Sequence, residues 1–155
     1  MRLVLLTAAM LACGATQAAA QADLTQAVSA FLNSYANGDK AAVIAAVEPN
    51  VHLYGSGLSE TYNGVEGASD MFDKDTRLWD GSAKFGTMWH VTAVREGNLE
   101  SIMFDIPFTA GRIGTVTERF AMVWHLEGDT WKLAQSSISV PATGQSAGDV
   151  LKHAH

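Results

Sequence analysis

A single carboxylate interrupts an apolar row near the end of the chain. From Val116 to Trp124 every second residue is apolar except Glu118. Alternation with period two is typical of a β-strand that has one dry face and one wet face. Glu118 falls on the dry face, where loss of water would raise its pKa and suit it to proton transfer. The alternative is an ion pair with Arg95 or Arg112 at the edge of a sheet.

Two other residues are candidates for acid–base chemistry. Asp105 is flanked by apolar residues in a second predicted strand, and His90 is flanked by them in a third. An enzyme of this kind would use Glu118 or Asp105 as the acid or base, with a tyrosine or His90 as proton shuttle. The alternative for His90 is a packed or surface position. We place His125, which lies on the polar row, on the outer face.

Several side chains have the types that line a pocket for a small molecule. Such pockets are mostly apolar and aromatic, with a few polar groups that orient the ligand. The alternative for the aromatic members is packing in the core. The residues predicted to contact a ligand are Tyr35, Tyr54, Trp79, Trp89, Met122, Trp124, Gln135 and Ser137.

Metal, phosphate and nucleophile signatures are weak. His153 and His155 have chelating spacing, but two ligands near a chain end make a poor metal site. The Asp73-Lys74-Asp75 segment lacks the rest of a calcium loop, and Gly55-Ser56-Gly57 is not followed by the lysine of a phosphate loop. A serine triad has no nucleophile elbow to support it. We therefore expect neither a metal nor a cofactor.

Helical spacing dominates the first half of the chain. Apolar residues recur on one face from Leu24 to Tyr35 and again from Val65 to Trp79. Between them, Asp39 caps a short helix that carries Val47 inward and ends at Pro49-Asn50. These helices must cover whatever sheet the second half forms.

The remaining elements are predicted strands joined by turns that contain glycine. Helices first and an antiparallel sheet after them indicate an α+β domain with its helices on one face. The predicted strands are Val51–Tyr54, Lys84–Arg95, Leu99–Phe108, Thr115–Leu126 and Trp131–Val140.

The first twenty residues have the pattern of an export signal. Arg2 precedes a short apolar run from Leu3 to Ala12, and alanines 18–20 form a cleavage site. The alternative is a buried helix, and Cys13 raises the further alternative of lipidation. We expect residues 1–20 to be a signal peptide, 21–141 the domain and 142–155 a flexible tail. The mature protein would be periplasmic or secreted, without stable membrane insertion.

Composition describes an ordinary globular domain with an acidic surface. The 155 residues are 48% hydrophobic and 17% charged. Without the signal peptide, nine Lys and Arg stand against sixteen Asp and Glu, a formal charge of −7. Such a charge argues against nucleic acid as a partner. Cys13 is the only cysteine, so cleavage after Ala20 leaves no thiol or disulfide.

Short motifs in a fixed order resemble the SnoaL-like branch of the nuclear transport factor 2-like superfamily. The resemblance covers roughly residues 23–141. It is carried by Tyr35-Ala36-Asn37-Gly38-Asp39, Pro49-Asn50-Val51, Gly55-Ser56-Gly57 with Glu60, Tyr62-Asn63-Gly64, Val123-Trp124-His125, Trp131-Lys132-Leu133-Ala134-Gln135 and Ser139-Val140-Pro141. It implies a cone: a curved antiparallel sheet wrapped around the N-terminal helices, with a pocket at the open end and a homodimer through the outer sheet face.

The resemblance does not assign a reaction, because the family's known catalytic groups are missing here. In related steroid isomerases the catalytic positions correspond to Phe31, Gly55 and Met122, and none of these can hold an oxyanion or act as a base. The arginine and histidine of kinase association domains correspond to Met122 and Ser137. We expect an exported domain that binds a small, largely apolar molecule. The alternatives are an isomerase, lyase or cyclase, and a non-catalytic dimerisation or assembly module.

Overall fold

The chain folds as an α+β domain, as predicted. The computed structural model describes residues 24–111, 114–142 and 146. The N-terminal helix spans residues 24–36. It is followed by α2 (Lys40–Ala45), β1 (Val47–Tyr54), β2 (Thr61–Asn63), α3 (Gly64–Trp79), β3 (Lys84–Phe85), β4 (Trp89–Glu96), β5 (Leu99–Ala110), β6 (Gly114–Glu127) and β7 (Thr130–Ser139).

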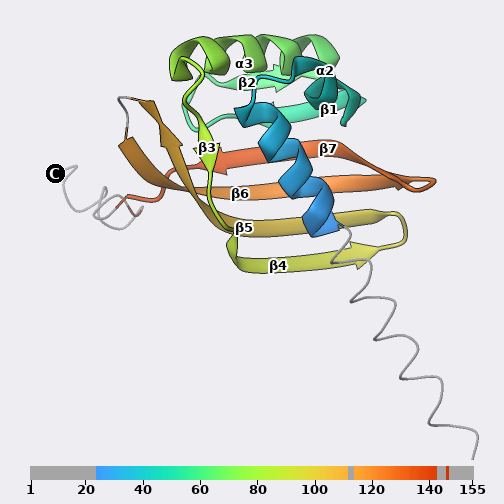
Figure 1. The fold of residues 1–155 in the computed structure, drawn as a ribbon. Helices are drawn as coiled ribbons and strands as arrows, with labels where there is room; N and C mark the ends of the chain where they lie inside the picture. The colour runs from blue at the N-terminus through green and yellow to red at the C-terminus, as the bar shows by residue number, and fades with distance from the viewer. Residues whose placement is uncertain (1–23, 112–113, 143–145, 147–155) are drawn as a thin grey trace, which may run out of the picture.

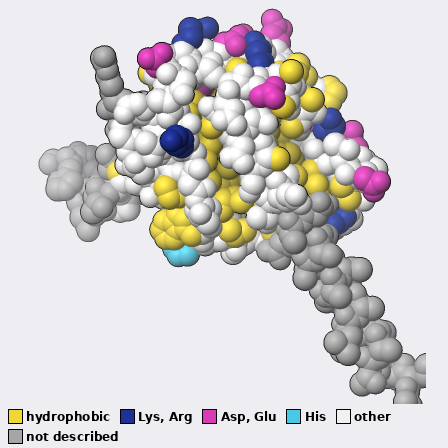
Figure 2. Space-filling model, in the orientation of Figure 1, with side chains coloured by type: hydrophobic (Ala, Val, Ile, Leu, Met, Phe, Trp, Pro, Cys, Tyr) yellow, Lys and Arg dark blue, Asp and Glu magenta, His cyan; other side chains and the backbone are white. Residues whose placement is uncertain are grey.

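One curved sheet forms the body of the domain. Its strands are ordered β2-β1-β7-β6-β5-β3, and β4 also pairs with β5. The N-terminal helix crosses β5, β6 and β7, while α3 lies beyond β1 and β2 (Figure 1). Both helices cover the same face, so the sheet has a covered inner face and an outer face. Figure 2 shows charged side chains of both signs gathered where α2 and α3 lie.

The long β5–β6 hairpin has the predicted alternation. Ile106 pairs with Glu118 and Phe104 pairs with Phe120, so these residues share the inner face. Ile106, Phe104 and Phe120 are each at most 3% exposed. The dry row of β6 read from the sequence is therefore confirmed, with Glu118 on it.

The core lies between this inner face and the helices. Phe31 of the N-terminal helix meets Trp124 of β6 edge to face, with ring centroids 5.6 Å apart. Leu24, Val28 and Val43 are at most 1% exposed, so both the N-terminal helix and α2 contribute to the core. Fully burying side chains of this size stabilises a fold by roughly 1.5–3 kcal/mol each.

The first strand begins earlier than predicted. Val47, expected on a helix, opens β1 and pairs with Leu133 of β7. The pairing is parallel, so the sheet is mixed and not purely antiparallel. Pro49 lies inside β1 at a register shift between Val47 and His52. A bulge tolerates proline because it needs no ladder hydrogen bond from the missing N–H.

The strand predicted at 84–95 is interrupted. The backbone N–H of Gly86 donates to the carbonyl of Pro107 at 2.8 Å, after which the chain leaves the ladder and re-enters it at Trp89. The register then shifts between Trp89 and Thr92, and His90 adopts a φ of +51°. Two short strands, β3 and β4, therefore replace the one long strand.

Some predicted segments lie outside the described residues. These are the export signal at residues 1–20, Arg112, the His153/His155 pair and most of the predicted tail. None of the helices in the described part of the chain is long and apolar enough to cross a membrane.

Candidate functional site

A cavity of about 260 Å³ opens between the N-terminal helix, α3 and the inner face of the sheet. Its wall is largely aromatic and aliphatic. The apolar lining residues are Phe31, Leu32, Tyr35, Leu53, Tyr62, Met71, Leu78, Trp79, Phe85, Phe108, Val116, Phe120, Met122, Leu133, Ile138 and Val140. Five residues with polar side chains join them, together with the backbone of Gly55: Ser56, Glu60, Asp75, Glu118 and Ser136. A mostly apolar hollow with a few polar groups is typical of a small-molecule site.

Glu118 of β6 is a partly buried carboxyl group that lines this cavity. Burial raises its pKa to about 7, and the nearby negative charge of Asp75 adds to the effect. Of the two cations considered from the sequence, Arg95 has other partners. Arg95 donates to the carbonyl of Gly97 and lies over the Trp131 ring, and Arg112 is outside the described residues. A carboxyl group that is half protonated near neutral pH can both accept and donate a proton.

Tyr35 and Asp75 form a second polar unit in the cavity. The Tyr35 hydroxyl donates to Oδ2 of Asp75 at 2.8 Å, joining the N-terminal helix to α3. Burial raises the pKa of Asp75, although the hydrogen bond from Tyr35 opposes the change. Burial, with the charge of Asp75, raises the pKa of Tyr35 far above its usual value, so Tyr35 stays a neutral donor.

A third polar unit, Glu60 with Lys74 and Tyr62, borders the cavity. Lys74 Nζ lies 2.6 Å from Oε1 of Glu60 and 3.3 Å from the Tyr62 hydroxyl. Glu60 also accepts from the backbone N–H of Gly57 at 2.8 Å. The hydrogen bond from Lys74 lowers the pKa of Glu60, the reverse of the effect at Glu118. Glu60 is therefore an ion-paired carboxylate.

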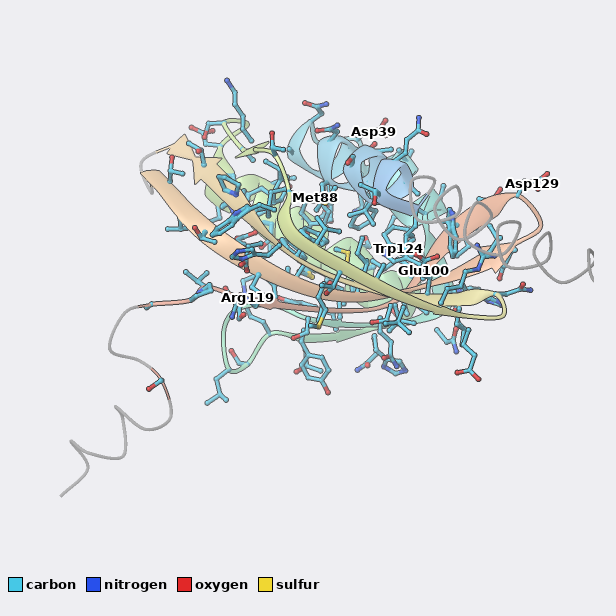
Figure 3. The ribbon with its side chains drawn as sticks, turned by 90° about the horizontal axis from the view of Figure 1, so that it is seen from below. Asp39, Met88, Glu100, Arg119, Trp124 and Asp129 are labelled. Atoms are coloured by element: carbon cyan, nitrogen blue, oxygen red, sulfur yellow. The ribbon has the colours of Figure 1, made fainter. Side chains whose placement is uncertain are left out.

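The structure places Asp105 and His90 outside this cavity. Asp105 is on the outer face, where Arg119 Nε donates to its Oδ1 at 2.8 Å and His90 Nδ1 lies 3.0 Å from its Oδ2. Figure 3 shows Arg119 on the side of the sheet away from the N-terminal helix, and Trp124 on the side toward it. The hydrogen bond from Arg119 lowers the pKa of Asp105, with a further contribution from His90. The arrangement is that of an ion-pair cluster.

The predicted aromatic and sulfur-containing residues divide into two groups. Tyr35, Trp79 and Met122 line the cavity. Tyr54 and Trp89 do not, and they are 55% and 45% exposed. Trp124 is 1% exposed and belongs to the core, where it borders a second, more open hollow beside the β6–β7 turn.

Gln135 and Ser137 are displaced from the cavity by a β-bulge. Trp124 pairs with Leu133 but Val123 pairs with Gln135, so Ala134 is the extra residue of β7. One inserted residue exchanges the two faces of a strand for every position after it. Consequently Ser136 and Ile138 line the cavity. Gln135 and Ser137, which were predicted to line it, are exposed on the other face.

Sequence reasoning missed Asp75, which was considered only as part of an incomplete calcium loop. The signal was present, because Asp75 follows Met71 by four residues and precedes Trp79 by four. Residues at that spacing share one helix face. Both neighbours line the cavity, and Asp75 lines it with them.

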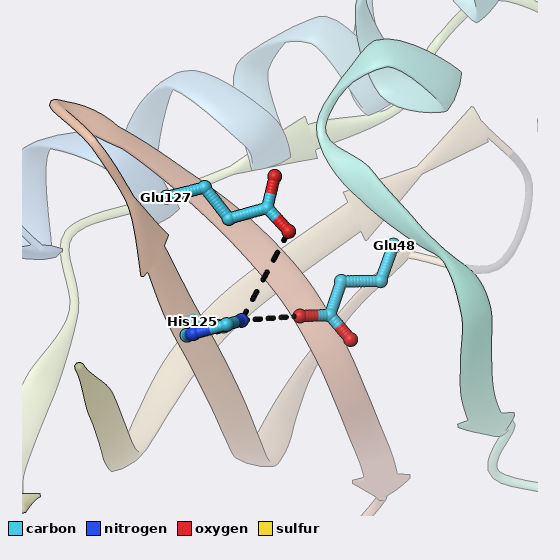
Figure 4. A group of neighbouring side chains, drawn as sticks. All are labelled: Glu48, His125 and Glu127. Carbon is cyan, nitrogen blue, oxygen red and sulfur yellow. Dashed lines mark hydrogen bonds and ion pairs between the residues drawn. The ribbon is translucent and has the colours of Figure 1, made fainter.

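A separate polar cluster joins Glu48 of β1 to His125 and Glu127 of β6 (Figure 4). His125 Nδ1 lies 3.0 Å from Oε1 of Glu48 and 4.0 Å from Oε1 of Glu127. One ligand atom from each residue fits within 4.8 Å of the others, the only such trio among the described residues. The side chain of Glu127 is 52% exposed, and Nδ1 of His125 is already hydrogen-bonded to Glu48. We assign the cluster the structural role of tying β1 to the hairpin.

The chain belongs to the SnoaL-like domain family, whose model matches residues 24–143. A comparison with curated proteins finds no sequence relative of this chain. The nuclear transport factor 2-like, or cystatin-like, fold is shared with many solved structures, which confirms the expected fold.

Three solved structures illustrate the likeness. A nuclear transport factor 2-like protein from Novosphingobium aromaticivorans is 10% identical, with a TM-score of 0.72 and coverage of 98% of this chain and 100% of that one. A protein of unknown function from Pseudomonas putida is 14% identical, with a TM-score of 0.71 and coverage of 83% and 91%. A protein from Parabacteroides distasonis with the provisional name ketosteroid isomerase is 14% identical, with a TM-score of 0.60 and coverage of 75% and 86%. At such identities the likeness concerns the fold alone.

Proposed function

We propose that this protein binds a small, largely apolar molecule in the cavity beneath its N-terminal helix. The observation that carries the proposal is the cavity itself, about 260 Å³ with a mostly apolar wall and a few buried polar groups. Burial of an apolar ligand there would be favourable by roughly 25 cal/mol per Å² of apolar surface removed from water. The polar groups would set the orientation of the ligand.

A neutral fluorescent probe tests this proposal. N-phenyl-1-naphthylamine fluoresces strongly only in an apolar site, so we expect its emission to rise with wild-type protein and saturate. Val116→Phe places a ring in the cavity and should abolish the rise. Val94→Phe is the matched control, because Val94 is 74% exposed on β4 and does not line the cavity. Equal probe binding by both variants would place the apolar site elsewhere.

A second candidate function is proton transfer on the bound molecule, in a reaction of isomerase, lyase or cyclase type. The observation that favours it is Glu118, whose pKa burial raises to about 7 inside the cavity. At neutral pH such a group supplies both the base that removes a proton and the acid that returns it. Asp75, in its protonated form, would donate a hydrogen bond to an oxygen that gains charge, while it accepts one from the Tyr35 hydroxyl.

Exchange of ketone α-protons tests the catalytic candidate without knowledge of the substrate. Cyclohexanone in D₂O loses its α-proton NMR signals when a base removes those protons. We expect wild-type protein to accelerate this loss over buffer, Glu118→Gln to lower the acceleration by about a hundredfold, and Glu127→Gln to leave it unchanged. Equal rates for wild type and Glu118→Gln would remove Glu118 from the mechanism.

Export to the periplasm and a homodimer through the outer sheet face remain proposals. They rest on the Arg2 to Ala20 pattern and on the family resemblance respectively. A non-catalytic assembly role would depend on that dimer, and size-exclusion chromatography with light scattering measures the subunit number directly.

A further inference from the structure

The charges that face the cavity all have one sign. Glu60, Asp75 and Glu118 line it from the loop after β1, from α3 and from β6. Among the described residues that line the cavity, none is a lysine, arginine or histidine. Lys74 forms an ion pair with Glu60 at 2.6 Å, but the side chain of Lys74 is half exposed. Among the described residues neither Asp75 nor Glu118 forms an ion pair, and the charge of Lys74 has only a minor effect on the pKa of Asp75.

Neither of those two carboxyl groups has a full set of partners. Asp75 accepts one hydrogen bond, from the neutral hydroxyl of Tyr35. For Glu118 the described residues provide neither a hydrogen bond nor an ion pair within 4.0 Å, while the Asp75 charge acts on it unfavourably. A desolvated carboxylate is costly unless it is paired, so a cation between the two groups would relieve both.

The rest of the wall also suits an organic cation. Aromatic rings approach the cavity from the N-terminal helix, α3, β5 and β6, including those of Tyr35, Trp79 and Phe108. Tyr35 and Trp79 contact each other with ring centroids 5.5 Å apart, and Trp79 lies 4.9 Å from Phe108. The faces of aromatic rings attract cations, most strongly where water is excluded. A metal ion would gain little from such a wall, because its preferred ligands are oxygens and nitrogens.

We infer that the largely apolar molecule bound in this cavity carries an amino group, which enters as an ammonium ion and pairs with Glu118 and Asp75 against the aromatic wall. The inference rests on the proposed binding function and names the class of its ligand. It excludes carboxylic acids and phosphate esters, whose negative charge would meet those of Asp75 and Glu118, two groups that have no ion-pair partner in the described part of the chain. It is compatible with proton transfer, since an adjacent ammonium keeps Glu118 in the basic form.

Three compounds with one rigid carbon skeleton separate shape from charge. 1-Aminoadamantane is cationic at pH 7.5, 1-adamantanol is neutral and adamantane-1-carboxylate is anionic. Titration calorimetry should give the amine about tenfold or more tighter binding than the alcohol, and the carboxylate the weakest binding. Equal affinities would uphold the apolar site and overturn the amine inference. Binding of the carboxylate ahead of the amine would also overturn it, and binding of none of the three would overturn both proposals.

Substitutions of single carboxyl groups then identify which of them causes the preference for the amine over the alcohol. Glu118→Gln and Asp75→Asn should each reduce the amine-to-alcohol preference about tenfold while the alcohol still binds, which shows that the cavity remains folded. Glu127→Gln is the matched control, because Glu127 is on the same strand β6 but is 52% exposed at the far end. If Glu127→Gln lowers the preference as much as Glu118→Gln, general surface charge and not the cavity selects the amine.

Proton release gives an independent readout. The titratable groups that line the cavity with Glu118 are Asp75, Tyr35, Glu60 and Tyr62, and the charge of Asp75 acts on Glu118. Because the pKa of Glu118 is about 7 in the free protein, a bound ammonium should displace on the order of half a proton at pH 7. Calorimetry in two buffers of different ionisation enthalpy measures this number. Uptake of protons, or no change on binding 1-aminoadamantane, would contradict contact between the amine and Glu118.

Discussion

The hydroxyl of Tyr35 donates to the carboxylate of Asp75 at 2.8 Å, across forty residues of sequence, inside a cavity that both residues line. The contact fixes the N-terminal helix relative to α3. It also leaves Tyr35 neutral and keeps the Tyr35 hydroxyl proton engaged, so Glu118 is the cavity carboxyl group that can accept a proton from a ligand without first losing a partner.

Tyr35→Phe should lower the free energy of unfolding by roughly 1–2 kcal/mol. The phenyl ring retains the contacts with Phe72 and Trp79, at centroid distances of 5.2 and 5.5 Å, so the loss reports the hydrogen bond to Asp75. Because that bond lowers the pKa of Asp75, the loss should be larger at pH 8 than at pH 5. Urea denaturation at both pH values measures it. Unchanged stability at pH 8 would mean that the bond does not form.

Glu118→Gln should become more stable relative to wild type as the pH rises. The pKa of Glu118 is raised from 4.5 to about 7, so between these values the folded protein holds a proton that the unfolded chain has lost. Wild-type stability therefore falls across this window by up to about 3 kcal/mol, and the loss is complete above pH 7. The variant lacks this penalty. Denaturation curves at pH 4.5, 6 and 8 measure the difference in free energy of unfolding between the variant and wild type, which should grow with pH. A difference that stays constant would contradict desolvation of Glu118.

Asp105→Asn should have the opposite pH dependence and no effect on the cavity. Arg119 and then His90 lower the pKa of Asp105, so its contribution to stability is present above its unfolded pKa and is lost as the pH falls through the folded value. The variant should be less stable than wild type at pH 7 and converge with it in acid. N-phenyl-1-naphthylamine should bind it as well as wild type. Loss of probe binding would show that the outer-face cluster acts on the cavity.

The fold could be predicted from the sequence where a pattern is local and periodic. The alternation of apolar residues along β6 correctly predicted that Glu118 lies on the inner face of the sheet. Ile106, which pairs with Glu118 in the neighbouring strand, is buried. The periodic apolar face predicted for the N-terminal helix is also confirmed, because Leu24 and Val28 on that face are fully buried.

The prediction failed where tertiary pairing overrides a local pattern. No local signal marks Ala134 as an extra residue. Because of the bulge that it forms in β7, Ser136 lines the cavity and Gln135 does not. Val47 was read as helical by its spacing, whereas parallel pairing with Leu133 draws it into β1. Asp105 lies between two inward residues, and its own side chain points outward to Arg119, a partner fourteen residues away.

Titration of the Glu118 side chain tests the central claim most directly. Carbon-13 chemical shifts of the glutamate carboxyl groups, assigned by comparison with Glu118→Gln, give its pKa in the folded protein. A buried carboxyl group in an apolar ligand cavity predicts a midpoint near pH 7, displaced downward when 1-aminoadamantane is bound. A midpoint near 4.5, unchanged by the amine, would show a solvated side chain and contradict the proposed site.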